Sequence, residues 1–280
     1  MIEFSWDIHH SCNYRCPYCW FYDKWDEIEK NNVYPGLKRL VEIWRRIYDK
    51  YGCAQIQING GEPFTYPDFS KLITEISKMH KVGITTNSSG DIKSITEKAN
   101  KSNVSLGMSF HPLFVDLNTF LEKAIIAKES GIATNVLFLA WPGQLERIFD
   151  YKRTFEEHGI RFTVLTFWGK YNGKDYPQGY SDEEREILSL VLGTRGESGE
   201  KFQLTPKITK GKLCRAGQTY ALIHPNGNVY RCGGGNWRIQ HEPFSNLFSE
   251  DFSLLPEPLP CDSNECPCNE WSFLLVDNQK

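Results

Sequence analysis

Three cysteines near the beginning of the chain have a spacing suited to metal chemistry. Cys12, Cys16 and Cys19 occur in the order C-N-Y-R-C-P-Y-C, just after a short run at residues 4–8 that predicts a first β-strand. The spacing gathers three thiolates on one loop, which suits an iron–sulfur cluster, and it leaves the fourth iron of a cubane without a protein ligand. An iron with an open position can bind a small molecule.

A structural zinc site and an electron-carrying ferredoxin are the alternatives for this loop. Either would be expected to bind its metal through four protein ligands, and no fourth cysteine lies nearby in the sequence. His9 and His10 could supply the missing ligand. The cysteine spacing alone therefore leaves these kinds of site open.

A second segment, Asn59-Gly60-Gly61-Glu62-Pro63, carries residues suited to ligand binding. Its two glycines would let the backbone approach a ligand closely, and Glu62 is an acceptor suited to an ammonium group. The same residues also fit an ordinary turn in which Pro63 opens a helix. The segment indicates a function only when it is considered together with the cysteine loop.

Together, the row C-x3-C-x2-C with Tyr18 before its last cysteine and the Gly60-Gly61-Glu62-Pro63 segment resemble the signature of the radical S-adenosylmethionine (SAM) superfamily. The resemblance implies that Cys12, Cys16 and Cys19 are catalytic and bind a [4Fe-4S] cluster whose free iron chelates SAM. It further implies reductive cleavage of SAM to a 5'-deoxyadenosyl radical, which takes a hydrogen atom from the substrate. A flavodoxin or ferredoxin-type protein would be the electron donor.

The resemblance also implies which side chains contact SAM. The implied cofactor-binding residues are Tyr18, Gly60, Gly61, Glu62, Pro63, Asn87, Ser109, Phe167 and Trp168. In this assignment the glycine segment holds the SAM amino group, Asn87 and Ser109 contact its ribose and carboxylate, and the aromatic rings pack on adenine. His111 is either a ligand-facing, catalytic base or a loop histidine hydrogen-bonded beside Pro112.

Alternating strands and helices would position these residues. The hydrophobic pattern predicts strands at 4–8, 54–59, 82–86, 103–110, 133–139 and 160–167, separated by helices at 36–51, 69–76, 91–101, 117–125 and 144–158. Six such units in series predict an α/β fold with a parallel sheet and right-handed crossovers. The expected architecture is a partial (β/α)6 TIM-like barrel, which is also the fold that the resemblance implies.

Chemically distinctive segments follow the predicted strands, where β/α barrels carry their reactive face. Strand alternation also separates polar from apolar residues. One face carries Ser5, Asp7, His9, Gln55, Gln57, Asn59, Ser105, Gly107 and Ser109. If the apolar faces meet the helices, the barrel lumen is polar and suits a hydroxyl-rich substrate better than a lipid. Ordinary packing around internal water is the alternative.

The pattern divides the chain into a radical SAM partial barrel at 1–192, a polar linker at 193–213 and a small cysteine-rich module at 214–280. A helix is expected at 182–192, after a connecting segment at 169–179. Within the module, Cys214 and Cys232 bracket a hairpin signal at Pro225-Asn226-Gly227-Asn228 as C-x12-G-x4-C.

The other module cysteines form the row C-x4-C-x-C, namely Cys261, Cys266 and Cys268. Their spacing favours metal over disulfide bonds, with zinc and iron–sulfur both open. The first part resembles the opening of the Twitch and SPASM modules, which implies an auxiliary [4Fe-4S] cluster and hence two clusters in all. Five cysteines exceed the four ligands of one cluster, so one of the last three would stay a thiol. Cys53, standing alone, is predicted to be a buried strand residue.

Composition narrows the class of partner. The formal net charge is −3 and the pI is near 6.2, so no basic surface points to nucleic acid or an anionic membrane. No signal peptide or membrane span is evident, and a cytoplasmic location is expected. The nine cysteines then indicate metal ligands rather than disulfides.

The expected function is a radical SAM oxidoreductase acting on a small polar molecule such as a sugar, aminocyclitol or nucleoside. Oxidation to a ketone is preferred, and epimerisation by a hydrogen atom from the spare thiol is the alternative. A peptide maturase ranks lower, because only eleven residues precede Cys12. A non-enzymatic iron–sulfur electron carrier ranks last, because it would not need the glycine segment or a polar lumen.

Overall fold

A computed structural model describes residues 1–22, 24–192, 207–233, 242–266 and 271–276. Six parallel strands form its centre and confirm the predicted fold class. They are β1 (Glu3–Asp7), β2 (Gln55–Asn59), β3 (Lys81–Thr86), β4 (Val104–Ser109), β5 (Ala133–Ala140) and β6 (Arg161–Thr166). Among the described strands the sheet begins at β13 and ends at β6, so it is an open, partial barrel.

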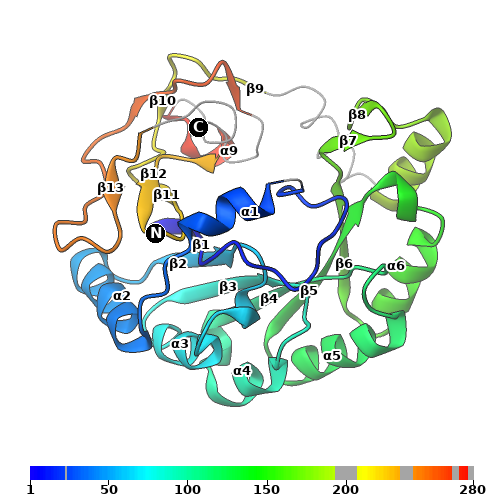
Figure 1. The fold of residues 1–280 in the computed structure, drawn as a ribbon, viewed down its shortest axis with the longest axis horizontal. Helices are drawn as coiled ribbons and strands as arrows, with labels where there is room; N and C mark the ends of the chain where they lie inside the picture. The colour runs from blue at the N-terminus through cyan, green and yellow to red at the C-terminus, as the bar shows by residue number, and fades with distance from the viewer. Residues whose placement is uncertain (23, 193–206, 234–241, 267–270, 277–280) are drawn as a thin grey trace.

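Five helices cover the outer side of this curved sheet (Figure 1). They are α2 (Leu37–Tyr51), α3 (Phe69–Ile76), α4 (Ile92–Lys98), α5 (Leu117–Glu129) and α6 (Ile148–Glu157). Residues 182–192 are helical as expected. The helix α6 begins four residues later than the pattern predicts, because Pro142–Gln144 form a separate 3-10 turn, η4.

The strands alternate as the sequence pattern predicts. The apolar residues Phe4, Trp6 and Ile56 are at most 2 % exposed, and Phe4 and Trp6 contact Trp44 of α2 with ring centroids 5.7 and 5.3 Å apart. The opposite face is partly exposed and polar. On it Gln57 Nε2 donates to Thr85 Oγ1 (3.1 Å). The predicted polar face is therefore confirmed on β2 and β4, whereas Leu137 of β5 lies beside Gly107 on the same face.

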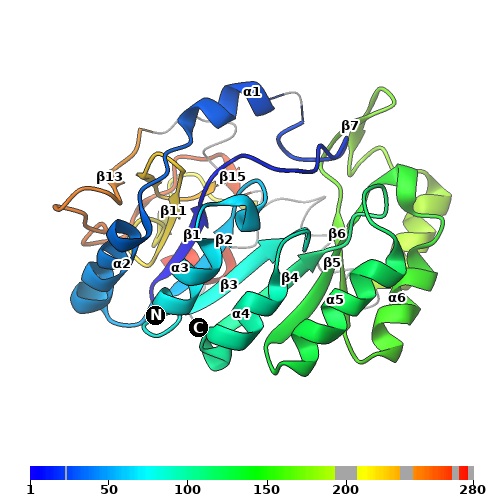
Figure 2. The ribbon, with the colours of Figure 1, turned by 60° about the horizontal axis from the view of Figure 1, so that its bottom comes forward.

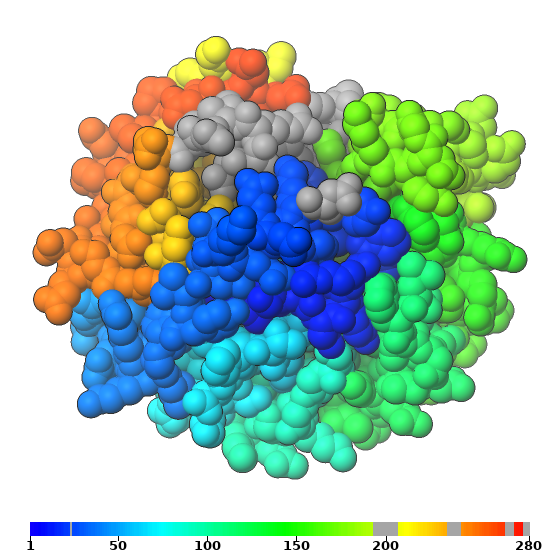
Figure 3. Space-filling model, in the orientation of Figure 1, coloured from blue at the N-terminus to red at the C-terminus, as the bar shows by residue number. Residues whose placement is uncertain are grey.

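The chain after β1 crosses the carboxyl ends of the strands before it reaches α2 (Figures 1 and 2). It carries the three cysteines and the short helix α1 (Trp25–Ile28), followed by the 3-10 turn η1 (Glu29–Asn31). In the space-filling view this segment occupies the middle of the face, between the C-terminal segment and residues near 170–190 (Figure 3). It therefore covers the open end of the barrel.

The C-terminal segment joins the barrel sheet. Its strand β11 (Tyr220–Ile223) pairs in parallel with β1, and β12 (Asn228–Tyr230) and β13 (Ser245–Asn246) continue the sheet outward. The strands β11 and β12 are the hairpin predicted around Gly227, whose φ of +83° suits glycine. Pairing with β1 was not foreseen, because it joins residues more than 200 positions apart.

Smaller elements complete the described chain. The expected connection at 169–179 is instead a hairpin of β7 (Gly169–Tyr171) and β8 (Lys174–Tyr176). Two further strand pairs are β9 (Lys207–Ile208) with β15 (Glu265–Cys266), and β10 (Leu213–Cys214) with β14 (Leu259–Pro260); the helix α9 spans Trp271–Leu274. Most of the predicted linker, 193–206, lies outside the described residues. Its remainder already pairs with the cysteine-rich segment.

The prediction that Cys53 is a buried strand residue is wrong. Cys53 is exposed and precedes β2, because Gly52, with φ +76°, ends α2 and redirects the chain through a turn. It therefore lies at the amino end of the strand, opposite the cysteine loop. None of the described helices combines the length and apolar character needed to cross a membrane.

Candidate functional site

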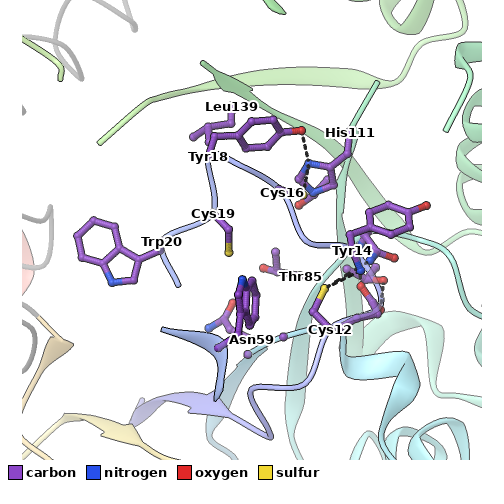
Figure 4. A pocket seen from close by; sticks show the side chains of 17 residues that line it. Cys12, Tyr14, Cys16, Tyr18, Cys19, Trp20, Asn59, Thr85, His111 and Leu139 are labelled. Atoms are coloured by element: carbon purple, nitrogen blue, oxygen red, sulfur yellow. Dashed lines mark hydrogen bonds between the residues drawn. The ribbon is translucent and has the colours of Figure 1, made fainter. Parts of the chain in front are cut away.

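A cavity of about 200 Å³ lies at the carboxyl ends of the central strands, under the cysteine loop (Figure 4). It brings together ten of the residues assigned from the sequence, namely Cys12, Cys16, Tyr18, Cys19, Gly60, Gly61, Glu62, Asn87, Ser109 and His111. They come from four separate parts of the chain: the cysteine loop and the ends of β2, β3 and β4. Parallel strands make this convergence possible, because their carboxyl ends share one edge.

The three thiols sit in surroundings of low polarity. Burial raises the pKa of Cys12 to about 11 and the pKa of Cys16 to about 12, and it also raises the pKa of Cys19. N–H donors nevertheless face one of the sulfurs, since Tyr14 N lies 3.3 Å from Cys12 Sγ. Such donors stabilise a thiolate once a cationic metal has replaced its proton.

The sulfurs share a cavity without meeting at one point. In the described part of the chain, no three ligating side chains are close enough together to hold a single metal ion. A cubane cluster needs a wider arrangement, because each cysteine sulfur binds a different iron. Three thiols around one cavity, with N–H donors beside Cys12, therefore fit an iron–sulfur cluster.

Gly60 and Gly61 permit close approach of another group, and in the structure that group is the backbone of the protein itself. A Cβ at Gly60 would lie 2.1 Å from the carbonyl oxygen of His9, and one at Gly61 would lie 2.0 Å from that of Ser11. Gly61 N donates to the His9 carbonyl (2.7 Å) and Glu62 N donates to the Ser11 carbonyl (2.9 Å). The glycines thus fasten the start of the cysteine loop to the end of β2.

The carboxylate of Glu62 is occupied by protein donors. It accepts hydrogen bonds from Thr86 Oγ1 and Asn87 N, both at 2.6 Å, and from Phe64 N at 3.1 Å. Burial raises the pKa of this carboxyl, and the three donors oppose the rise. The side chain therefore joins the ends of β2 and β3, a role the sequence did not suggest.

Asn87 links β3 to the cysteine loop. Its Nδ2 donates to Asn13 Oδ1 (2.9 Å), and its Oδ1 accepts from Ser89 N (2.9 Å). Ser109, at the end of β4, lines the same cavity. Both residues are placed where a bound molecule could meet them, and their assignment to SAM stays a prediction.

His111 and Tyr18 form a packed pair beside Cys16. The two rings stack with centroids 5.8 Å apart, and Tyr18 Oη lies 3.1 Å from His111 Nδ1. Burial lowers the pKa of His111 to about 4 and raises that of Tyr18, so both side chains are neutral near pH 7. Trp141 contacts the Tyr18 ring at 5.2 Å. His111 is thus a partly buried partner of the cysteine loop.

Three assigned residues lie outside this cavity. Pro63 is buried at the start of the 3-10 turn η2 (Pro63–Thr65), while Phe167 and Trp168 line a neighbouring groove of about 710 Å³. The groove and the cavity meet along Tyr18, Cys19 and Trp20, which line both. Further cavity residues went unassigned, namely Tyr14, Trp20, Trp25, Thr85, Thr86 and Leu139. Most of them could have been identified from the sequence by their proximity to Cys12 or to the end of a predicted strand.

Four of the five C-terminal cysteines are described. Cys232 and Cys261 pack against a small core formed by Cys214, Ala216, Tyr220, Leu274 and Leu275. Burial raises the pKa of Cys214, and the neighbouring Cys261 and Cys266 raise it further. Cys214 of β10 and Cys266 of β15 thus lie in one part of the fold, and their assignment to an auxiliary cluster stays a prediction. Cys268 lies outside the described residues.

Comparison with known proteins agrees with this geometry. The family model of the Radical SAM superfamily matches residues 6–126. GTP 3',8-cyclase of Aquifex aeolicus is 25% identical over 257 residues, covering 79% of this chain and 78% of that protein. The subtilosin biosynthesis protein AlbA of Bacillus subtilis is 19% identical over 271 residues, covering 90% of this chain and 56% of that protein.

The fold is also found in a solved structure. SuiB of Streptococcus suis superposes with a TM-score of 0.63 at 20% sequence identity, covering 89% of this chain and 64% of SuiB. SuiB has been solved with S-adenosylmethionine and with its precursor peptide SuiA. At this identity the likeness concerns the fold. The present chain spans less than two thirds of SuiB and of AlbA.

Proposed function

Because the chain belongs to the radical SAM superfamily, whose cofactors are a [4Fe-4S] cluster and SAM, we propose that it removes a hydrogen atom from a polar substrate held on the concave face of the sheet. When bound, these cofactors supply a 5'-deoxyadenosyl radical by one-electron cleavage of SAM. The observation that carries the proposal is the single cavity shared by Cys12, Cys16, Cys19 and the ends of β2, β3 and β4.

The side chains around the cavity have distinct proposed roles. Cys12, Cys16 and Cys19 hold the cluster. Since the Glu62 carboxylate is engaged by β3, the backbone of Gly60 and Gly61 is the part of the segment that would receive the SAM amino group. Asn87 and Ser109 would orient the ribose and carboxylate. An adenine ring reaching past Tyr18 would meet Phe167 and Trp168 in the groove.

The hydroxyl and amide groups that line the cavity support a polar, hydroxyl- or amide-bearing substrate. Asn59, Thr85 and Ser109 line it at the strand ends, and the concave face continues with further amides and hydroxyls. None of the described residues that line the cavity is a lysine or an arginine. A triphosphate, such as the GTP in the name of the cyclase relatives, therefore gains no charge partner there. A sugar, aminocyclitol or nucleoside fits better.

Oxidation is the proposed outcome. Loss of one electron and one proton from a carbinol radical gives a ketone, and an auxiliary cluster on Cys214, Cys232 and two of Cys261, Cys266 and Cys268 would accept the electron. An epimerase would instead return a hydrogen atom from a thiol to the carbon, and that atom would exchange with solvent. Product mass in deuterium oxide distinguishes the two outcomes.

A peptide is the second candidate substrate, and the open groove beside the cavity favours it. The groove is larger than the cavity and carries aromatic and charged side chains, including Tyr22, Lys24 and Lys170. An extended peptide could lie there and extend one side chain past Trp20 towards the cysteines. The names of AlbA and of the SuiB–SuiA structure agree with such a substrate.

The deciding experiment is anaerobic turnover of the reconstituted protein with SAM and dithionite. Each candidate substrate carries deuterium on its carbon-bound positions, and mass spectrometry follows deuterium transfer into 5'-deoxyadenosine. Transfer from a sugar, aminocyclitol or nucleoside supports the first proposal, and transfer from a peptide supports the second. SAM that is never cleaved under reducing conditions would contradict both.

Two variants separate the candidates further. Thr85→Val removes a hydroxyl from the cavity while keeping the side-chain shape, and it should raise KM for a small polar substrate at least tenfold if that hydroxyl binds substrate. Tyr22→Ala changes only the groove, where Tyr22 is 52% exposed. It should raise KM for a peptide and leave that of a small molecule unchanged.

A further inference from the structure

We propose that His111 acts through Cys16 on the cluster of the cysteine loop: its Nδ1–H donates a hydrogen bond to the sulfur of Cys16 and thereby raises the reduction potential of that cluster. The inference rests on the proposed function, since it requires a cluster on Cys12, Cys16 and Cys19. It deepens that function by assigning a residue that controls how readily the cluster takes up an electron.

The geometry around Cys16 is the first support. His111 Nδ1 lies 3.8 Å from Cys16 Sγ, within reach of a hydrogen bond to sulfur, and 3.1 Å from Tyr18 Oη. Figure 4 shows the imidazole between the Cys16 segment and Tyr18. The bond therefore needs no rearrangement of the site.

The imidazole is held in place from several sides. Its ring stacks on Tyr18 at an angle of 22° and meets the edge of Tyr14, with centroids 6.0 Å apart. The His111 carbonyl accepts hydrogen bonds from Phe114 N and Val115 N at 2.9 and 3.2 Å, which fixes the turn after β4. A side chain fixed in this way loses little entropy when it makes a further hydrogen bond.

Proton counting gives the direction of the bond. A free Cys16 thiol can donate to Nδ1, but a thiolate bound to iron has no proton and can only accept. If His111 carried its proton on Nε2, the Tyr18 hydroxyl, which is also hydrogen-bonded to Cys16, would have one proton for two acceptors, Nδ1 and the sulfur. With the proton on Nδ1, the sulfur receives a hydrogen bond from the imidazole or, in relay, from Tyr18. The thiolate therefore selects the Nδ1–H tautomer.

The expected consequence is electrostatic. A cluster gains negative charge on reduction, and hydrogen bonds to its sulfurs stabilise that charge, which raises the potential. Cys12 faces two donors, the backbone N–H of Tyr14 at 3.3 Å and the side-chain amide of Asn87, whose Nδ2 lies 3.9 Å from the sulfur. For Cys16 the donor is a side chain, so this contribution can be removed by substitution.

The test is a redox titration of the holoprotein followed by electron paramagnetic resonance (EPR). The cluster on the cysteine loop is identified as the one whose spectrum changes when SAM is added. In His111→Phe the ring is kept and the donor lost, so the reduction equilibrium constant should fall by up to about tenfold, equivalent to 59 mV for one electron. His111→Asn places an amide N–H near the position of Nδ1 and should restore most of the potential.

The outcomes separate this inference from packing effects and from the proposed function. Equal potentials in the wild type and His111→Phe, at equal iron content, would overturn it, as would an equal fall in His111→Phe and His111→Asn. Absence of a cluster from the wild-type loop would overturn the proposed function and this inference with it. A pulsed EPR coupling from 15N-labelled histidine to the reduced cluster, lost in His111→Phe, supports it directly.

Discussion

The carboxylate of Glu62 accepts a 2.6 Å hydrogen bond from the backbone N–H of Asn87, and so joins the end of β2 to the end of β3. The same carboxylate accepts from the hydroxyl of Thr86, also at 2.6 Å. A glutamate that the motif assigned to the SAM ammonium is thus fully engaged inside the protein, with 1% of its surface exposed. Replacing Glu62 is therefore expected to lower the stability of the fold.

Replacing Glu62 with alanine should destabilise the fold in the absence of SAM. The change leaves the donors of Thr86, Asn87 and Phe64 buried without their acceptor, at a cost of about 3 kcal/mol in the free energy of unfolding. Urea unfolding measures it. Glu62→Gln keeps one acceptor oxygen and should be intermediate. An alanine variant with wild-type stability but weakened SAM binding would instead support the ammonium assignment.

Gly61→Ala should disturb the cysteine loop. Its new Cβ would lie 2.0 Å from the carbonyl oxygen of Ser11, a backbone atom that can move only with the loop. Iron content after anaerobic reconstitution should fall at least severalfold, together with the melting temperature. Gly36→Ala is the matched control, because nothing lies within 4 Å of its Cβ position. Equal iron content in both variants would contradict the prediction.

Iron analysis should detect two clusters. Reconstituted protein is expected to hold about eight iron atoms per chain, and the triple replacement of Cys12, Cys16 and Cys19 by alanine should remove about half of them. Cys214→Ser should lower the other half. Cys53→Ser, an exposed cysteine at the far end of β2, should leave the iron unchanged. Stoichiometric zinc in the native protein would refute the auxiliary cluster.

His80 should make the fold sensitive to acid. It is fully buried, its Nδ1 accepts from Ala54 N (3.1 Å) and its Nε2 donates to the Trp44 carbonyl (2.9 Å), so the bond from Ala54 needs the neutral ring. Burial lowers its pKa in the folded state. Below about pH 6.5 this histidine therefore binds a proton in the unfolded chain but not in the folded one. The free energy of unfolding then decreases as the pH is lowered, by up to about 1.4 kcal/mol per pH unit.

The pH dependence of urea unfolding between pH 7 and pH 5 measures this contribution. His80→Gln can make both hydrogen bonds without titrating, so its slope should be smaller than that of the wild type. His158→Gln changes an exposed histidine and should keep the wild-type slope. A His80→Gln variant with an undiminished slope would show that other groups cause the acid sensitivity.

The sequence alone determined the class of chemistry and the order of the elements. The spacing of Cys12, Cys16 and Cys19 is a local property of one loop, and the periods of the apolar residues in α2 and β2 are local as well. Placement at strand ends followed from topology, since parallel strands present their carboxyl ends together. This is why ten assigned residues line one cavity.

Only the tertiary structure decided what those side chains contact. That Gly60 and Gly61 pack on His9 and Ser11, and that the Glu62 carboxylate bonds β3, depends on distances between elements that no local pattern contains. The pairing of β11 with β1 and the position of His111 beside Cys16 have the same origin. A sequence fixes which groups are available for bonding, whereas the packing of distant segments determines which partner each group meets.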